Sequence, residues 1–588
     1  MGFTRRDLLT FTGGTTAGLL FTPVPWGLLR DTAVLSENWP GIPQPLHGEI
    51  RTRYTTCTLC PAGCGVRARC DGDQPVGLAG VPGHPASRGV LCPAGLVGHH
   101  LAFCRDRATE PLAHGKPVAI ESAAAAVSAA IAACGAREAV AILDPRPGRA
   151  ASLVYRRFLA ELPKGVHCAP PDSQPNGPFG IDLENTRAIL SFGAPVLDGW
   201  LSPGRVLANR SHFQLIQVEP AYSRTASLAD LWVPVLPGSE DEFATAVVRA
   251  LQGETTDAHA MDVARTLLRN KPAIAVGGGP AVARLNAVLG SIGRPGGFLP
   301  RRDFTPVTDI ASVPDGSIRV LLIEETAGGD PLPWDLLRRK LVPQDPVLVA
   351  LTPWLDGCAQ HADYVIPAPM YLESLDEAPT PAGSTVAGFS LSPALLTAPP
   401  KLAAPAGFVL RLAHDSATYP DILKRRVAAI KKGGRGAVFT YPDAKSTRVS
   451  DIADLWKSML GGALWLDDPL PAGTARGADL QVCAGPPGPA LPPNREYPLV
   501  LIAASAPPPH GSPLMSKLYR ESGLRRPANA ATVHPKTGRD QGLADGDRAI
   551  VTSRAATFPV QVVFDPAVMP GVIEMAGQAV SPASIRRA

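Results

Sequence analysis

Long apolar runs and concentrated charge are what this 588-residue chain lacks. Beyond the N-terminus no stretch holds 18 uninterrupted apolar residues, so we expect no internal membrane span. The formal net charge is only +4, and no basic stripe is interleaved with aromatic residues, so no nucleic-acid partner is expected. No internal repeat of fixed period is visible, and no Ser-His-Asp set can be assembled from spacing.

The remaining composition is that of an ordinary globular protein. Apolar residues make up 45% of the chain and charged residues 18%, a balance typical of folded chains. This length accommodates three or four domains with buried cores. The 63 prolines and 57 glycines predict many turns and long irregular connections.

The N-terminal segment differs from the rest of the chain. Arg5 and Arg6 precede a weakly apolar, Gly/Thr-rich run from Leu8 to about Leu29. Paired arginines before such a run resemble a twin-arginine export signal, so we expect residues 1–32 to bring the chain to the periplasmic side of the membrane. A chance Arg-Arg pair ahead of an N-terminal helix is the alternative. No A-x-A cleavage site is obvious, so the segment is expected to act as a signal or an anchor.

Short β-branched runs alternate with helical patterns from residue 138 to 367. This order predicts a parallel, doubly wound α/β sheet. A capping box at residues 239–242 is expected to open one of the helices. The strand candidates are 139–142, 188–192, 214–218, 273–276, 319–323 and 347–351, and the helix candidates include 122–133, 152–162, 240–251 and 281–289.

The last third of the chain divides into two parts. Residues 378–495 are rich in proline, alanine and glycine, with one short helical stretch near 451–459, and we expect connecting and covering structure there. From residue 496 on, strand patterns alternate with turns. They predict a compact C-terminal β domain with strands at 499–502, 548–552 and 560–564.

Four of the ten cysteines have the spacing of a metal site. Cys57, Cys60 and Cys64 form C-x2-C-x3-C, and Cys92 follows after 27 residues. Three thiolates on one tight loop can occupy three corners of an iron-sulfur cube, and a distant fourth closes the site after an intervening hairpin. The spacing therefore favours one [4Fe-4S] cluster bound by these four cysteines.

Zinc and disulfide bonds are the alternatives to that cluster. A zinc site needs two CxxC-like pairs, and the second half of the motif offers one cysteine. Three cysteines within eight residues pair poorly among themselves as disulfides. Cys70 and Cys104 flank the motif without fitting it, and we expect them to be buried thiols.

The cysteine motif and its surroundings resemble the molybdopterin oxidoreductase superfamily. The stretch CTLCPAGCGV at 57–66, with CPAG at 92–95, is similar to the family's N-terminal cluster domain. The resemblance covers about residues 50–575 and implies an α/β fold with an N-terminal 4Fe-4S domain, two Rossmann-like α/β domains and a C-terminal double-psi β-barrel. Later landmarks of the family recur in order as TASLADLWVPVLPG at 225–238, GRPGG at 293–297, ADYVIP at 362–367, LE at 372–373 and GLADGD at 542–547.

The resemblance also implies a division into domains. The expected parts are a signal or anchor at 1–32, a cluster domain at 50–105, one α/β domain at 106–165 plus 345–415, a second at 166–344, a linker and covering segment at 416–494, and the barrel at 495–588.

One branch of the superfamily fits better than the others. LSFGA at 190–194 and WLSP at 200–203 resemble the molybdopterin-like subunits of menaquinone reductase complexes and of alternative complex III. That branch has the fold but carries no molybdenum. The implied partners are a multihaem cytochrome c, a ferredoxin-like multi-cluster iron-sulfur protein and a polytopic quinone-binding membrane subunit.

Three departures from the active members of the family predict that molybdopterin guanine dinucleotide is absent. The lysine or arginine that bridges cluster and pterin in those members is replaced by Ala94. The span 162–182, where a metal ligand is expected, is about half the usual length, and its one cysteine is Cys168. The sequence stops soon after Gly577, whereas active members continue with residues that cover the pterin. Arg205, Arg210 and Arg224 are the basic residues that could still bind a pterin phosphate.

The remaining candidate residues have ordinary structural readings. Gly277–Pro280 lies at a strand–helix junction where phosphate could bind, but it is expected to be a turn. His99 and His100 could contact a partner haem or a proton path, although surface or packed histidines are the more common case. Glu324 and Glu325 form an acidic pair at a strand end with no visible partner.

The sequence therefore predicts an iron-sulfur subunit of a membrane-associated, quinone-linked electron-transfer complex. One alternative is an active molybdenum or tungsten bis-pterin oxidoreductase that acts on a small oxyanion, polysulfide or formate. The other is a structural scaffold whose cluster never cycles.

Overall fold

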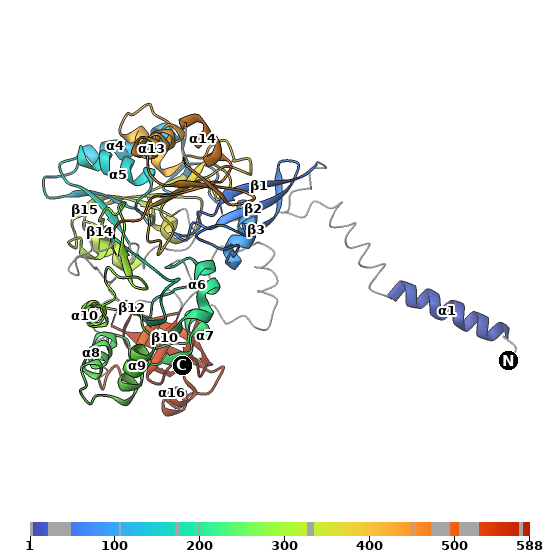
Figure 1. The fold of residues 1–588 in the computed structure, drawn as a ribbon, viewed down its shortest axis with the longest axis vertical. Coiled ribbons are helices and arrows are strands. Elements are labelled where there is room, and N and C mark those ends of the chain that lie inside the picture. The colour runs from blue at the N-terminus through green and yellow to red at the C-terminus, as the bar shows by residue number, and fades with distance from the viewer. Residues whose placement is uncertain are drawn as a thin grey trace.

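A computed structural model gives the structure of the chain. It describes residues 4–21, 49–104, 107–170, 177–197, 200–325, 334–448, 451–471, 494–504, 529–554, 556–575 and 580–588. Residues 22–32 of the expected signal, Cys483 and Gly577 lie outside this part. Within it, the strands form several open sheets and one closed barrel (Figure 1).

The N-terminal helix α1 (Arg5–Phe21) lies away from the other elements in Figure 1. It contains both arginines of the expected export signal. Of the helices that the structure describes, none has the length and apolarity needed to cross a membrane.

A small antiparallel sheet comes first in the body of the protein. It contains β1 (Ile50–Thr56), β2 (Gly65–Asp71) and β3 (Gln74–Gly80) in that order. Helix α3 (Pro93–Val97) and the 3-10 turn η1 (Gly98–Phe103) follow. The β2–β3 pair is the hairpin that the cysteine spacing predicts between the third and fourth cysteines.

The largest sheet has eight strands in the order β14-β7-β6-β15-β16-β17-β4-β5. Its central pairs, from β7 to β17, are parallel. Two separate parts of the chain supply these strands, because a second α/β unit is inserted between them. The strands are β4 (Leu112–Ala113), β5 (Lys116–Pro117), β6 (Ala139–Leu143), β7 (Gly165–Ala169), β14 (Thr308–Asp309), β15 (Ile318–Glu324), β16 (Val347–Thr352) and β17 (Tyr364–Pro367).

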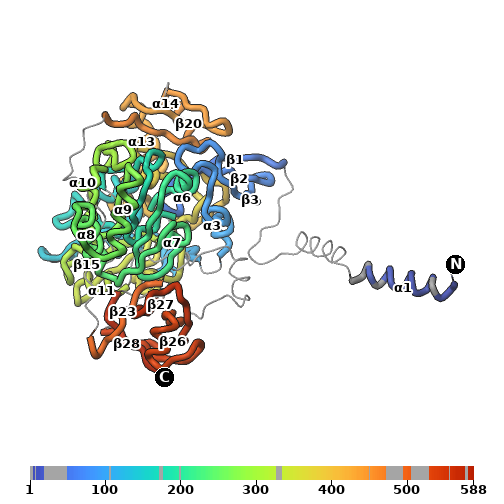
Figure 2. The backbone as a smooth tube through the Cα atoms, turned by 60° about the horizontal axis from the view of Figure 1, so that its bottom comes forward, coloured from blue at the N-terminus to red at the C-terminus, as the bar shows by residue number. Residues whose placement is uncertain are grey.

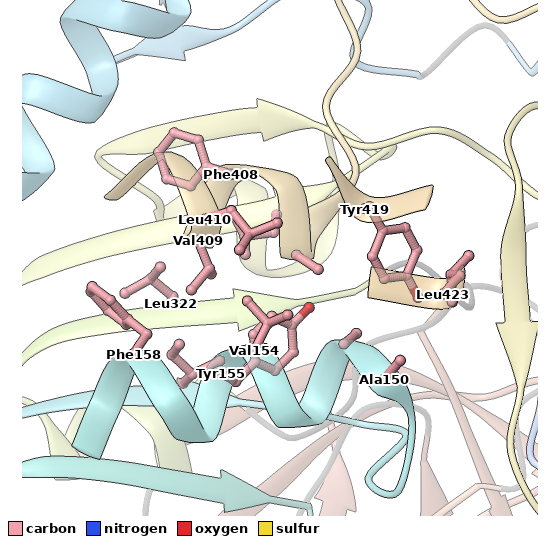
Figure 3. Close-up of a cluster of buried hydrophobic side chains, with 14 of the residues drawn as sticks. Ala150, Val154, Tyr155, Phe158, Leu322, Phe408, Val409, Leu410, Tyr419 and Leu423 are labelled. Atoms are coloured by element: carbon pink, nitrogen blue, oxygen red, sulfur yellow. The ribbon is translucent and has the colours of Figure 1, made fainter. Parts of the chain in front are cut away.

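One apolar core joins this sheet to five helices. Figure 3 shows its centre, where α5 side chains such as Tyr155 and Phe158 face Phe408 and Val409 of α12 and Leu322 of β15. Burial of such side chains from water is the main favourable term in folding. The helices are α4 (Ile120–Ala132), α5 (Ala150–Ala160), α12 (Pro405–Leu412), α13 (Tyr419–Gly433) and α14 (Ile452–Leu460).

The inserted unit is a four-stranded parallel sheet in the order β11-β10-β9-β12. Helices α8, α9 and α10 pack their apolar faces on it. Its elements are β9 (Ala188–Phe192), β10 (Gln214–Val218), β11 (Leu231–Val233), β12 (Ala273–Gly277), α6 (Pro203–Asn209), α7 (Arg224–Leu228), α8 (Glu240–Leu251), α9 (Ala258–Arg269) and α10 (Pro280–Leu289), and the short pair β8 (Phe179–Ile181) and β13 (Phe298–Pro300) lies beside it.

Residues 376–466 contain more regular structure than the sequence predicts. A five-stranded sheet in the order β18-β19-β22-β20-β21 forms there, and α13 belongs to the segment expected to be linker and cover. The expectation of mainly connecting structure is wrong, because alternating apolar residues in these short strands contribute to the core of the large sheet. The strands are β18 (Asp376–Ala378), β19 (Gly388–Ser392), β20 (Ala437–Thr440), β21 (Lys445–Thr447) and β22 (Leu464–Leu466).

The C-terminal strands close into a barrel in the order β23-β27-β24-β26-β25-β28. Figure 2 shows it below the α/β units, and the backbone amide of Tyr222 donates to the carbonyl of Ala567 at 2.7 Å, so the barrel docks on the loop after β10. The elements are β23 (Leu499–Ala503), β24 (Ala530–Val533), α16 (Pro535–Asp540), β25 (Arg548–Ser553), β26 (Thr557–Phe564), β27 (Val572–Met575) and β28 (Ser581–Arg587).

The expected capping box at the start of α8 does not form. Ser239 is the N-cap residue, but its side chain makes no capping hydrogen bond. Glu240 instead accepts from the amide of Gly238 at 2.7 Å, and Asp241 accepts from Gly279 at 3.1 Å. The acidic side chains of the first turn therefore accept hydrogen bonds from amides of neighbouring loops and do not cap the helix.

Candidate metal centre

The first three cysteines lie on the tight loop between β1 and β2. The antiparallel register ends at Thr56 opposite Gly65, and the amide of Cys57 donates to the carbonyl of Cys64 at 2.8 Å. Gly63 has a φ of +57°, a conformation that residues with a Cβ rarely adopt. The hairpin geometry therefore brings the three thiols to one end of the sheet.

Cys92 reaches the same region from the other side of the hairpin. It is the N-cap residue of α3, and its Sγ accepts from the amide of Gly95 at 3.4 Å. Backbone amides that donate to sulfur are the kind of contact that tunes an iron-sulfur cluster. The predicted bridging position, Ala94, lies in the same turn and contributes no polar group.

The turn between β3 and α3 is fixed against the cysteine loop by His84. Its Nδ1 accepts from the amides of Ala86 and Ser87 at 3.3 and 3.1 Å, and Ser87 in turn accepts from Gly65 at 3.3 Å. Burial lowers the pKa of His84 to about 3, so the ring is a neutral acceptor. A Cβ at Gly65 would lie 2.2 Å from this ring, so the close approach requires glycine.

The four thiols are close enough to influence one another. Cys57 and Cys64 are only 5% and 6% exposed. Burial raises the pKa of both thiols, and the neighbouring cysteines of the motif raise it further. Within the part of the chain that the structure describes, however, no three His, Cys, Asp or Glu side chains are grouped as a metal site. The assignment of Cys57, Cys60, Cys64 and Cys92 as ligands stays a prediction.

Tyr371 supplies a polar atom that the sequence did not indicate. Its ring packs with Cys57 and Cys64, and a Cβ at Gly98 would lie 2.8 Å from it. The hydroxyl is close enough to lower the pKa of Cys57, yet it makes no hydrogen bond of normal geometry. Burial raises the pKa of Tyr371, so its proton is retained.

These residues fit an iron-sulfur cluster. Burial and the neighbouring cysteines disfavour the negative charge of the Cys57 and Cys64 thiols, so these two thiols need a cationic group before they can ionise. The Gly95 amide and the buried Tyr371 hydroxyl, which lies beside Cys57, are donors suited to thiolate or sulfide acceptors. No signal in the sequence marks Tyr371 beyond its position before the Leu-Glu landmark.

The 200–203 segment packs directly on the cysteine loop. The hydroxyl of Ser202 donates to the carbonyl of Ala86 at 2.6 Å and lies close enough to Cys64 to lower its pKa. A Cβ at Gly204 would lie 1.8 Å from the carbonyl oxygen of Ser87. A motif noted only for its resemblance to one branch of the family is therefore part of the wall of this site.

The other candidates have structural contacts of their own. Cys168 is buried on β7, where its thiol donates to the carbonyl of Ile142 at 3.3 Å. The Asp241 carboxylate accepts from Gly279, so an acidic group occupies the helix N-terminus considered for phosphate. His99 and His100 pack together with ring centroids 4.0 Å apart, and burial lowers the pKa of His99 to about 4.

Glu324 has partners that the sequence did not reveal. It forms ion pairs with Arg146 and Arg149, at 3.4 and 2.6 Å. The sequence shows no partner for this pair because both arginines come from a distant loop that the sheet brings to Glu324.

Comparisons with known proteins agree with this site. Residues 50–102 match the model of the molybdopterin oxidoreductase Fe4S4 domain. The chain is 27% identical to the menaquinone reductase molybdopterin-binding-like subunit of Nitratidesulfovibrio vulgaris over 673 aligned positions, with 98% of this chain and 93% of that protein covered. It is 24% identical to a sulfite dehydrogenase component of Allochromatium vinosum, where the match covers 35% of this chain and 24% of that protein.

The fold is also that of solved structures. Acetylene hydratase from Pelobacter acetylenicus superimposes with a TM-score of 0.62 at 14% identity, and the match covers 90% of this chain and 93% of that one. The expected fold class is therefore confirmed, with its N-terminal Fe4S4 domain and its closed C-terminal barrel. Residues 50–102 are therefore similar to the molybdopterin oxidoreductase Fe4S4 domain, and the similarity to the menaquinone reductase molybdopterin-binding-like subunit extends over nearly the whole chain.

Proposed function

We propose that this chain is an iron-sulfur electron-transfer subunit of a quinone-linked redox complex and carries no molybdenum or tungsten. In this proposal Cys57, Cys60, Cys64 and Cys92 hold one [4Fe-4S] cluster, which supplies one-electron redox chemistry. The observation that carries it is the full-length similarity to a menaquinone reductase subunit, together with the four cysteines at one end of the small sheet.

Two of the three arginines that could bind pterin phosphates support the second part of the proposal. Arg205 donates to Glu184 at 2.8 Å and to the carbonyls of Ile181 and Gly383. Arg210 pairs with Asp230 at 2.8 Å. Burying phosphates without free basic partners is costly. Both side chains already have internal partners, so they offer little to a phosphate.

The residue at the bridging position supports it as well. The bridging position is Ala94, whose methyl group cannot connect a cluster electrostatically to a second cofactor.

The location and partners are the remaining parts of the proposal. We infer that Arg5 and Arg6 direct export of the folded chain by the twin-arginine route, so that it acts on the periplasmic side of the membrane. Its partners would be a multihaem cytochrome c, a ferredoxin-like multi-cluster protein and a polytopic quinone-binding subunit. The similarity to one subunit of a menaquinone reductase supports a multi-subunit assembly.

A second candidate function is an active molybdenum or tungsten oxidoreductase. The partial similarity to the sulfite dehydrogenase component favours it, and so does 26% identity over 34% of this chain to the major subunit of nitrate-inducible formate dehydrogenase from Escherichia coli. Each match covers only 24% of the longer protein, so it supports the shared fold more than the shared reaction.

Replacing Cys60 by Ala tests the cluster directly. The purified variant should lose about four irons per chain, and residues 50–105 should become more susceptible to proteolysis, because ligation energy supports this small domain. Cys70→Ala is the matched control, since Cys70 is buried on β2 of the same sheet but lies outside the motif. Unchanged iron in Cys60→Ala, or equal loss in Cys70→Ala, would contradict the ligand assignment.

A further inference from the structure

Two carboxylates meet at the carboxyl edge of the large sheet. Asp144 directly follows β6, and Glu324 ends β15. These strands are parallel neighbours with Leu143 opposite Ile323, so the two carboxylates leave the sheet side by side. Arg146 and Arg149 lie in the loop that leads from β6 into α5. Sheet topology therefore gathers four buried charges in one place.

Hydrogen bonds connect these charges into one network. Arg149 Nη2 donates to Asp144 Oδ1 at 2.8 Å and to Glu324 Oε2 at 2.6 Å. Tyr155 Oη also donates to Glu324 Oε2, at 2.7 Å. Arg146 Nη2 lies 3.4 Å from Glu324 Oε1. Arg149 thus joins the two carboxylates, and Glu324 joins Arg149 to Arg146 and Tyr155.

The inner end of the network reaches the cysteine loop. Arg146 Nη1 donates to the carbonyl of Thr58 at 2.8 Å, and Thr58 directly follows Cys57. A cavity of about 40 Å³ lies here, lined by Thr58, Arg146, Glu324 and Tyr371, among others. This cavity can hold water molecules between the network and the cysteine loop.

The outer end of the network reaches the surface through His167. Its Nε2 lies 3.2 Å from Asp144 Oδ2, and its side chain is 9% exposed. His167 also lines an open groove of about 490 Å³ together with Arg156 and Arg157 of α5. A continuous chain of polar contacts therefore runs from the groove through His167, Asp144, Arg149, Glu324 and Arg146 to Thr58.

The charged side chains of the network carry one more negative charge than positive charges. Arg146 and Arg149 carry two positive charges, while Asp144, Glu324 and Asp376, which lies 3.4 Å from Arg146, carry three negative ones. For these five side chains the sum is −1 while His167 is neutral, and it becomes zero when His167 binds a proton. Glu377 lies nearby, where burial raises its pKa and Arg149 and the donors Ala151 and Tyr419 act in the opposite direction.

His167 is the member best placed to exchange this proton. Burial raises the pKa of Asp144, but Arg149 and His167 outweigh that effect, so the pKa is lowered and the carboxylate stays ionised. The groups around His167 are Asp144 from the β6–α5 loop, Tyr155, Arg156 and Arg157 from α5, and Asp309 of β14 near the adjacent Cys168.

We propose that the network of Asp144, Arg146, Arg149, Glu324 and His167 is a proton-binding site that takes up a proton through the groove when the neighbouring cluster is reduced. This inference rests on the proposed function, because it needs the cluster at Cys57, Cys60, Cys64 and Cys92. A one-electron donor supplies the electron, and bulk water supplies the proton to the His167 imidazole. Both leave again on oxidation, and no other bond forms or breaks.

Thermodynamic linkage between proton binding and cluster reduction makes the proposal measurable. A negative charge added beside the network favours protonation, and by reciprocity protonation favours reduction. One proton per electron changes the reduction equilibrium tenfold per pH unit, which corresponds to about 59 mV for a one-electron couple. The midpoint potential of the holoprotein should therefore fall with rising pH across the range in which the network titrates.

The experiment is a dithionite titration of the full-length holoprotein at several pH values, followed by the electron paramagnetic resonance of the reduced cluster. The wild-type midpoint potential should depend on pH, and His167→Gln should abolish most of that dependence. His114→Gln is the matched control, since His114 pairs with Asp363 at 3.7 Å on an exposed edge of the same sheet. It should keep the wild-type slope.

A second variant keeps the test decisive if His167→Gln does not fold. Tyr155→Phe retains the ring and removes only the donor to Glu324, so the titration should move to higher pH. A normal cluster signal with a pH-independent wild-type potential would overturn the inference while leaving the proposed function intact, and so would a slope unchanged in both variants. Absence of any cluster signal in the iron-loaded wild type would instead contradict the proposed function.

Discussion

Replacing Tyr371 by Phe should have different effects on the protein without its cluster and on the protein with it. Without a cluster, the Tyr371 hydroxyl is buried and lacks a hydrogen bond of normal geometry, a situation that costs about 1–3 kcal/mol. Removal of that hydroxyl should therefore leave the stability of the apoprotein unchanged or increase it by about 1 kcal/mol. Urea unfolding of the iron-free chain measures this.

With the cluster bound, the same change should lower the reduction potential. A hydrogen bond to a charged acceptor contributes about 1.5–3 kcal/mol. The reduced cluster is more negative than the oxidised one, and we take the hydrogen bond to stabilise it more strongly by about a third of this energy, or about 0.7 kcal/mol. For a one-electron couple this difference corresponds to a shift in reduction potential of about 30 mV. Potentiometric titration of the reduced-cluster signal at one fixed pH measures the shift.

Tyr441→Phe is the matched control for both measurements. Tyr441 also has a buried hydroxyl without a hydrogen bond, but its ring stacks on His84 at 5.7 Å and does not belong to the cysteine cluster. Its removal should affect apoprotein stability alone. If Tyr371→Phe leaves the potential unchanged, or if Tyr441→Phe shifts it equally, the role given to the Tyr371 hydroxyl is refuted.

Three further predictions concern the ion network, acid stability and export. Arg149→Met should destabilise the chain by about 3–5 kcal/mol in urea unfolding, because two buried carboxylates each lose one of their charged partners, whereas Arg157→Met at an exposed pair should change stability by less than about 0.5 kcal/mol. The pKa of His84 is lowered to about 3, so its contribution to stability is complete above about pH 6.5 and declines by up to about 1.4 kcal/mol per pH unit as pH falls toward 3; His84→Asn should flatten that slope, and an equally steep profile in the variant would contradict the assignment. Changing Arg5 and Arg6 to lysine should trap the cluster-loaded protein in the cytoplasm, as measured by fractionation and immunoblotting, and continued appearance in the periplasm would count against twin-arginine export.

Much of the fold follows from local patterns in the sequence. The mostly apolar strands at 188–192 and 214–218 form with the expected bounds, because residues buried on both faces of a parallel sheet leave a recognisable pattern. The sheet at 376–466 was not predicted because its strands are short and separated by long connections, so each run is too short to show a period.

The candidate site was predictable only where its residues are close in sequence. The spacing of the four cysteines indicates a cluster, but Tyr371 and Ser202 reach the site from positions far along the chain. The ion network illustrates the same limit, since Arg149 and Glu324 meet only when β6 and β15 pair. Sequence order cannot reveal such partners without knowledge of strand order.

Elemental analysis of the purified, full-length wild-type chain tests the central claim most directly. If the chain is a molybdenum-free iron-sulfur subunit, anaerobic preparations should contain about four irons per chain and only trace molybdenum or tungsten, with no pterin fluorophore released on denaturation. Stoichiometric molybdenum or tungsten accompanied by a released pterin would contradict the account and favour an active oxidoreductase instead.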